Sequence, residues 1–144
     1  MYNLVDQPAD SLCRGGRFLL WAMRGWRHAL ECGTCPPVAL HRAFAALNAR
    51  TVLPDFHIAM TLLHRGGGER ISFAPVDFPR IVEDEAVLLS LWRGVAADNP
   101  GPVRRTLALL SGEETASPIS RAMASAVAHL RVAGFDLSRL TLAS

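Results

Sequence analysis

The sequence contains no lysine, only one tyrosine and three cysteines, and no long uninterrupted apolar run. An odd number of cysteines does not suit a framework of disulfides and favours a reducing compartment. Arginine or histidine interrupts every apolar stretch before it reaches the roughly 20 residues that a membrane-spanning helix needs. The first residues, MYNLVDQPADSL, lack the basic and apolar regions of a secretory signal. The sequence therefore predicts a cytoplasmic protein without a membrane span.

Half of the residues are hydrophobic, and the mean hydropathy is +0.20, which is high for a chain of 144 residues. Such an apolar surplus indicates either a tightly buried helical core or an apolar interface between copies of the chain. We favour the interface, so the sequence predicts a homodimer. All 15 basic residues are arginine, and the net charge is only +2. An arginine-rich, alanine-rich and lysine-free composition is typical of a GC-rich bacterial genome, and so mild a charge does not favour a nucleic-acid partner.

The stretch from Asp10 to Pro37 holds the longest amphipathic helix candidate and all three cysteines. Asp10 or Ser11 can cap its start, and Gly33, followed by Pro36 and Pro37, ends it. At about 100° per residue, one side of this helix collects its apolar residues. These are Phe18, Leu19, Ala22, Met23, Trp26, Ala29 and Leu30.

Five further segments have helical periodicity. They cover residues 38–50, 52–65, 82–97, 103–110 and 117–133. We expect the Gly66–Gly68 run to be a flexible end of the third helix, and Ser117 with Pro118 to start the sixth. The segment near residues 69–80 contains Pro75 and Pro79 and is predicted to be extended or irregular.

These segments predict an all-α fold, a compact bundle of five or six helices. We expect residues 1–144 to form a single domain, with residues 1–9 as an extended lead-in and residues 135–144 as a C-terminal tail. No internal repeat or domain boundary is evident in the sequence.

Two thiols and two imidazoles lie close together around the first turn: His28, Cys32, Cys35 and His41. Thiolate sulfur and imidazole nitrogen are the ligands that tetrahedral Zn²⁺ prefers, so these residues form a candidate zinc site. The same Cys-x-x-Cys pair allows a thiol-redox interpretation, because Cys35 precedes a helix start that would stabilise a thiolate. The third interpretation treats all three cysteines as packing residues and needs no cofactor.

The polar side of the first helix carries Arg14, Arg17, Arg24 and Arg27, with Trp21 among them. Such a face could bind an anionic partner, since arginine pairs with phosphates and stacks on bases. The acidic cluster at residues 83–85 could instead meet this face, within the chain or across a dimer.

No spacing of serine, histidine and aspartate suggests a catalytic triad, and the Gly66–Gly68 run lacks the lysine of a phosphate-binding loop. The sequence therefore favours an interaction or regulatory module over an enzyme, with a protein partner. The alternatives are a metal-binding or thiol-redox protein that uses the four Cys and His residues, and nucleic-acid binding through the arginine face.

Overall fold

The computed structural model describes residues 4–67 and 71–140, and this part of the chain is a bundle of six α-helices without a β-strand. The helices are α1 (Arg14–Glu31), α2 (Pro36–Ala46), α3 (Leu53–Gly67), α4 (Glu83–Ala96), α5 (Pro100–Ser111) and α6 (Glu113–Val132). Two 3-10 turns, η2 (Ala9–Ser11) and η3 (Arg50–Val52), precede α1 and α3. The predicted all-α class is confirmed.

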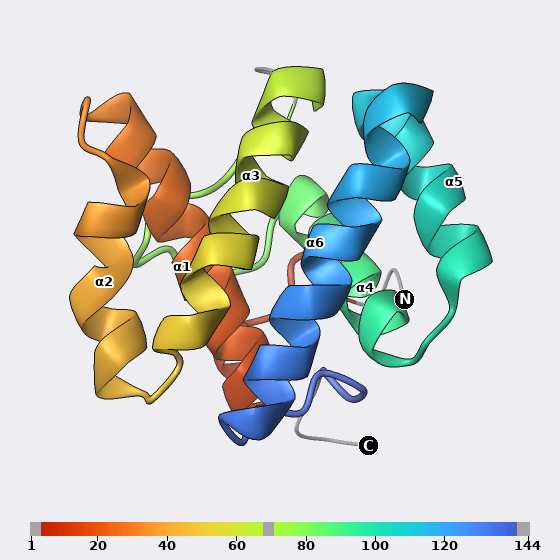
Figure 1. Ribbon diagram of the computed structural model, residues 1–144. Coiled ribbons are helices and arrows are strands. Elements are labelled where there is room, and N and C mark those ends of the chain that lie inside the picture. The colour runs from red at the N-terminus through yellow and green to blue at the C-terminus, as the bar shows by residue number, and fades with distance from the viewer. Residues whose placement is uncertain (1–3, 68–70, 141–144) are drawn as a thin grey trace.

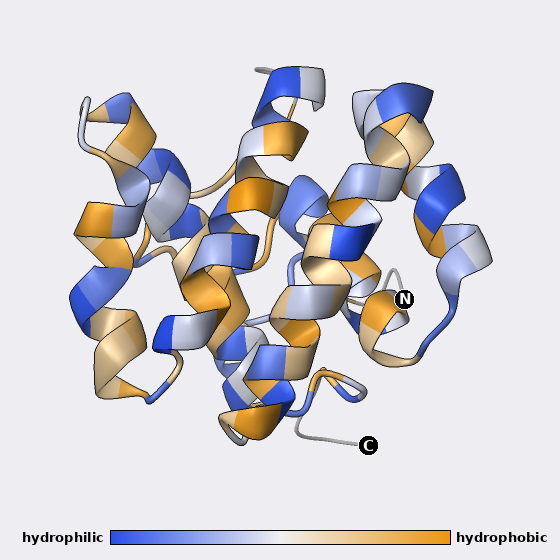
Figure 2. Cartoon of the chain, viewed as in Figure 1, coloured by the Kyte–Doolittle hydropathy of each residue, from blue (hydrophilic) through white to orange (hydrophobic). Residues whose placement is uncertain are grey.

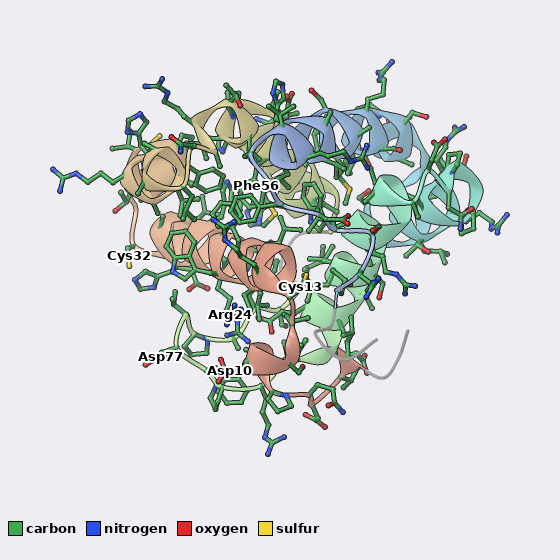
Figure 3. The ribbon with its side chains drawn as sticks, turned by 90° about the horizontal axis from the view of Figure 1, so that it is seen from below. Asp10, Cys13, Arg24, Cys32, Phe56 and Asp77 are labelled. Atoms are coloured by element: carbon green, nitrogen blue, oxygen red, sulfur yellow. The ribbon has the colours of Figure 1, made fainter. Side chains whose placement is uncertain are left out.

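The helices form two layers (Figures 1 and 3). Helices α3 and α6 pack side by side in one layer, α1 and α4 form the other, and α2 and α5 close the two edges. Figure 2 shows hydrophobic and hydrophilic residues alternating along each helix, as expected when one face of each helix packs inward. No helix in the described ranges is both long enough and apolar enough to cross a membrane.

A row of aromatic rings crosses the core and joins four helices. Phe18 of α1 contacts Phe44 of α2 with ring centroids 4.9 Å apart, Phe44 contacts Phe56 of α3 at 5.7 Å, and Phe56 contacts Trp92 of α4 at 6.1 Å. Figure 3 shows Phe56 between the two layers. Each such pair adds about 0.5–1.5 kcal/mol to the stabilisation from burial alone, so this row holds the two layers together.

Four of the helices end in the same hydrogen-bonded turn, with a left-handed residue just past the helix. This residue is Gly33 after α1, Asn48 after α2, Asp98 after α4 and Gly134 after α6. In each turn two backbone N–H groups bond back to the last carbonyl groups of the helix, as when Gly33 donates to Leu30. The predicted stop at Gly33 is therefore confirmed, and its physical basis is a Schellman motif.

The predicted cap of α1 is wrong. Asp10 and Ser11 belong to the turn η2, and α1 begins three residues after Ser11, at Arg14, with Cys13 as its N-cap. The sulfur of Cys13 accepts a hydrogen bond from the backbone N–H of Gly16 at 3.5 Å. A thiol thus takes the place that a hydroxyl or carboxylate usually occupies at a helix start.

Helices α5 and α6 are longer than predicted. Helix α5 already begins at Pro100, and α6 begins at Glu113 rather than near Pro118, which lies inside it. Proline is tolerated in the first turn of a helix because the N–H it lacks would have no partner there, but at Pro118 one backbone hydrogen bond of α6 is lost. Gly112, with a φ of 97°, makes the sharp turn between the two helices.

Gly66 and Gly67 do not form a flexible end, because both belong to α3. Gly66 lies against Ser111 of α5, and Gly67 lies against Ile71 and the carbonyl oxygen of Leu110. A Cβ atom at Gly66 would lie 2.6 Å from the Cβ of Ser111, which is too close for any real contact. The glycine therefore allows α3 and α5 to approach each other. Gly68, the last glycine of the run, lies outside the described residues.

The chain ends pack on the bundle where the structure describes them. Residues 4–9 of the predicted lead-in run beside the end of the α3–α4 connection: Asp6 N–H donates to the carbonyl oxygen of Ile81, and Ala9 N–H to that of Pro79, both at 2.8 Å. In the tail, Phe135, Leu137 and Leu140 are buried. Residues 1–3 and 141–144 lie outside the described ranges.

Candidate functional site

A buried ion pair joins α1 to α4. Arg24 is 3% exposed and Glu85 is 0% exposed. The guanidinium of Arg24 donates two parallel hydrogen bonds to the carboxylate, from Nε to Oε2 at 2.7 Å and from Nη2 to Oε1 at 2.8 Å. This bidentate geometry gives the strongest form of the arginine–carboxylate contact. Removing one partner would leave the other charge buried and unpaired.

The side chain of Arg24 also binds the backbone of the α3–α4 segment, which we define as residues 71–82. Nη1 donates to the carbonyl oxygen of Phe78 at 2.8 Å and to that of Val76 at 3.5 Å, while Nη2 donates to that of Arg80 at 2.7 Å. Every N–H of the guanidinium therefore has a partner. Figure 3 shows the segment on the outer side of α1 and α4, with Arg24 between α1 and the segment and Asp77 at the far edge.

The acidic start of α4 completes this arrangement from the other side. Glu85 accepts hydrogen bonds from the backbone N–H groups of Ala74 at 2.9 Å and Val82 at 3.0 Å. The carboxylate of Asp84 accepts one from the N–H of Ser72 at 2.7 Å. The described part of the predicted irregular segment is indeed without helix, and its form follows from these contacts; residues 69 and 70 lie outside the described ranges.

The predicted arginine face is therefore divided. Arg24 is buried, so the prediction that it belongs to an accessible face is wrong. Nη2 of Arg27 donates to the carbonyl oxygen of Ile71 at 2.7 Å, and its guanidinium lies 5.4 Å from the ring centroid of Phe73. Both inner arginines hold the α3–α4 segment instead of presenting charge to a partner.

The outer part of the predicted face remains at the surface. Arg14 and Arg17 are exposed, and Trp21 is half-buried with its ring stacked on Phe18 at a centroid distance of 6.4 Å. The guanidinium of Arg14 lies 4.5 Å from the ring centroid of Phe135. Two exposed arginines give much less charge for a phosphate backbone than the four of the prediction.

The residues of the predicted metal or thiol site lie at the α1–α2 turn and are exposed. His28 is in the last turn of α1, Cys32 ends that helix, Cys35 precedes α2, and His41 lies on α2. The sulfur of Cys32 is 3.7 Å from Nε2 of His28. Within residues 4–67 and 71–140, no three His, Cys, Asp or Glu side chains are gathered in a way that could hold a metal ion. The zinc site and the redox pair stay predictions.

The third cysteine has a structural role. The thiol of Cys13 donates to the carbonyl oxygen of Arg139 at 3.0 Å, and its backbone N–H donates to that of Leu140 at 2.6 Å, so the start of α1 holds the C-terminal tail. In that tail the pKa of Asp136 is lowered, chiefly because the backbone N–H of Ser138 donates to its carboxylate at 2.9 Å.

Two histidines of α3 lie on either side of Trp26 from α1. The indole Nε1 donates to Nδ1 of His57 at 3.0 Å, and the ring centroids of Trp26 and His64 are 6.0 Å apart. Burial lowers the pKa of His57, because the charged imidazolium loses hydration there. The bond to Trp26 requires neutral His57, since a protonated Nδ1 would be a donor.

A groove of about 610 Å³ lies between α4 and α5, and Val5 from the start of the chain also lines it. Its apolar lining includes Val87, Leu91 and Val103, and its polar lining includes Ser90 and Thr106. Sequence reasoning missed this groove. The available signal was a row of small residues on one face of α4, at positions 86, 90 and 94, that continues at position 97 just after the helix. Small side chains leave space beside a helix.

The two ends of the groove carry opposite charges, Glu83 at the start of α4 and Arg93 near its end. Both side chains are exposed, and neither belongs to an ion pair among the residues that the structure describes. Ten positions separate them, which corresponds to about 15 Å along a helix. The groove therefore has an apolar middle and two charged ends that are available to a ligand.

Comparisons of the chain with protein-family models, with curated proteins and with solved structures find no match.

Proposed function

We propose that this chain is an interaction module that binds its partner in the groove between α4 and α5. The observation that carries the proposal is the groove itself, whose volume of about 610 Å³ falls within the range of ligand sites in proteins. Apolar walls provide affinity when they lose contact with water, and a few polar groups fix the orientation of a ligand. This groove offers both kinds of group.

The remaining surface gives weaker support for a binding role. The inner arginines of α1 are engaged with the α3–α4 segment, and the exposed cysteines have only His28 close to a sulfur. Binding of nucleic acid would depend on the two exposed arginines, Arg14 and Arg17. A metal or redox function would depend on the α1–α2 turn, where the described His and Cys side chains do not form a group that could hold a metal ion. The groove is the better candidate, and we propose a cytoplasmic protein as its ligand.

The homodimer also stays a proposal. Among the large apolar side chains that the structure describes, Val132 at 89% and Leu109 at 84% are the most exposed. Helices α5 and α6 run in opposite directions (Figure 1), so the end of α5, near Leu109, lies far from the end of α6 at Val132. Single exposed apolar residues are common on monomers. Sedimentation equilibrium would show whether the chain associates with itself.

Titration with the apolar fluorophore anilinonaphthalene sulfonate (ANS) tests the groove. We expect the fluorescence of ANS to rise with saturation at one site, because the apolar walls exclude water from the dye. Thr106→Trp places a large ring in the groove and should abolish this binding. Leu109→Trp is the matched control, since it adds the same ring to α5 at a side chain that is 84% exposed and outside the groove.

Circular dichroism should first establish that both variants have the helicity of the unaltered chain. The proposal would be wrong if ANS did not bind to the unaltered chain, or if Thr106→Trp bound ANS as tightly as Leu109→Trp did.

A further inference from the structure

The positive charge at one end of the groove comes from the side chain of Arg93. Asn99 and Pro102, at the start of α5, also line the groove. The first turn of α5 contains no acidic residue, and its N-cap Asn99 makes no side-chain capping hydrogen bond. The N-terminus of a helix carries partial positive charge. Pro100 and Pro102 lack an N–H, however, and the partly negative C-terminus of α4 lies at the same end, so Arg93 supplies most of the positive charge there.

The negative end lies at the start of α4, where Glu83 is exposed beside the apolar walls. The neighbouring acids do not add to it equally, because Asp84 and Glu85 accept hydrogen bonds from the α3–α4 segment on the other side of the helix. Glu83 is therefore the acidic side chain of this cluster that a ligand in the groove can reach.

We propose that the ligand of the groove is an amphipathic helix of a partner protein, with acidic residues in its first turn and basic residues in its last turn, lying antiparallel to α4. This inference rests on the proposed function of the groove. In this direction the acidic turn meets Arg93 and the start of α5, and the basic turn meets Glu83. Apolar side chains spaced three and four residues apart on the ligand would contact the apolar walls between them.

The length of the groove agrees with such a ligand. The two charged ends are ten positions apart on α4, and a partner helix with charges in its first and last turns would span this distance of about 15 Å in three turns. The same order of charges favours the partner helix itself, because acids near its start and bases near its end complement its dipole.

Two cross-linked helical peptides of identical composition test the inference, each labelled with a fluorophore for anisotropy. Both carry the same leucine face; one has glutamates first and arginines last, and the other has the reverse order. The cross-link keeps both peptides helical, since short helices are otherwise marginal in water. At low ionic strength we expect the first peptide to bind about tenfold more tightly, because two exposed charge pairs are attractive in one case and repulsive in the other.

The double variant Glu83→Arg/Arg93→Glu provides the decisive control, since it exchanges the two ends of the groove without altering its apolar walls. We expect it to prefer the second peptide. Equal affinity of the two peptides for the unaltered chain, or an unchanged preference in the double variant, would overturn the inference. If ANS binds and is displaced by neither peptide, the groove takes another ligand, and only the inference fails. If ANS itself does not bind to the unaltered chain, the proposed function fails as well.

Discussion

Helix α4 borders two regions that use charge in opposite ways. On one side, Asp84 and Glu85 hold the α3–α4 segment, and the carboxylate of Glu85 is completely buried with Arg24. On the other side, Glu83 and Arg93 are exposed at the ends of a groove and form no ion pair among the described residues. The charges that hold the α3–α4 segment stabilise the fold, whereas the charges at the ends of the groove are available to bind a ligand.

The difference shows how little the type of a residue says about its role. Glu83 and Glu85 lie two positions apart on α4, but a helix turns by about 200° between them. One carboxylate therefore faces the α3–α4 segment and the other the groove. Variants that change one region at a time test this difference between the buried and the exposed charges.

The largest effect is expected for Glu85→Leu, which leaves Arg24 buried without its partner. We expect the free energy of unfolding to fall by about 3–5 kcal/mol, because an uncompensated buried charge is strongly destabilising. Glu83→Leu is the matched control on the same helix and should cost less than about 1 kcal/mol. Urea denaturation measures both values, and similar losses in the two variants would contradict the distinction between the regions.

The double variant Arg24→Met/Glu85→Leu separates the cost of a lone charge from the anchoring of the α3–α4 segment. It should regain part of the stability lost in Glu85→Leu, since no charge is left unpaired. The carbonyl oxygens that Arg24 held would still lack their donor, so trypsin should cleave after Arg80 faster than in the unaltered chain.

An intermediate effect is expected at Gly66, where α5 approaches α3. The added methyl group of Gly66→Ala would meet the backbone and Cβ of Ser111, so the helices must separate at a cost of about 1–3 kcal/mol. Gly101→Ala is the control on α5, because the nearest atom to its new Cβ is 4.0 Å away, and it should be neutral or stabilising by up to about 1 kcal/mol. Thermal unfolding of both variants tests this expectation, which fails if Gly66→Ala is as stable as Gly101→Ala.

The smallest effect is expected from the pH dependence of His57. Burial holds its pKa in the folded chain below the ordinary value of a histidine, so the unfolded chain binds more protons between the two pKa values. The contribution of neutral His57 to stability is present above the unfolded pKa and is lost as the pH falls through the folded pKa. We expect the stability of His57→Gln to fall less over this range in urea denaturation at a series of pH values. Parallel pH profiles of the two proteins would contradict the expectation.

Much of the helical fold could be predicted from the sequence, because helical periodicity and glycine stops are local signals. The stop after α1 at Gly33 is an example. Helices α5 and α6 begin before residues 103 and 117, where the sequence predicts their starts. Pro102 and Pro118 both lie inside helices, and the turn between the two helices depends on the positive φ of Gly112. Such a conformation is not visible in a helical wheel.

The site was less predictable, for a physical reason. A helical wheel places Arg24 and Arg17 on the same polar side but does not show which later segment covers one of them. The suggestion that the acidic cluster meets the arginines within the chain is confirmed for Glu85 and Arg24. The groove depends on how α5 returns beside α4 after Asp98, and that path is determined by tertiary packing and not by local sequence.

The anchoring of the α3–α4 segment has a consequence for how this protein can be altered. Arg24 binds carbonyl oxygens, which every residue possesses, and Glu85 binds N–H groups, which every residue except proline possesses; the side chains of Val76 and Phe78 stay 39% exposed. The shape of the segment is therefore largely independent of the identity of residues 76–78. We expect these positions to accept other short sequences without proline, so that the lysine-free bundle would display a chosen peptide in a fixed conformation.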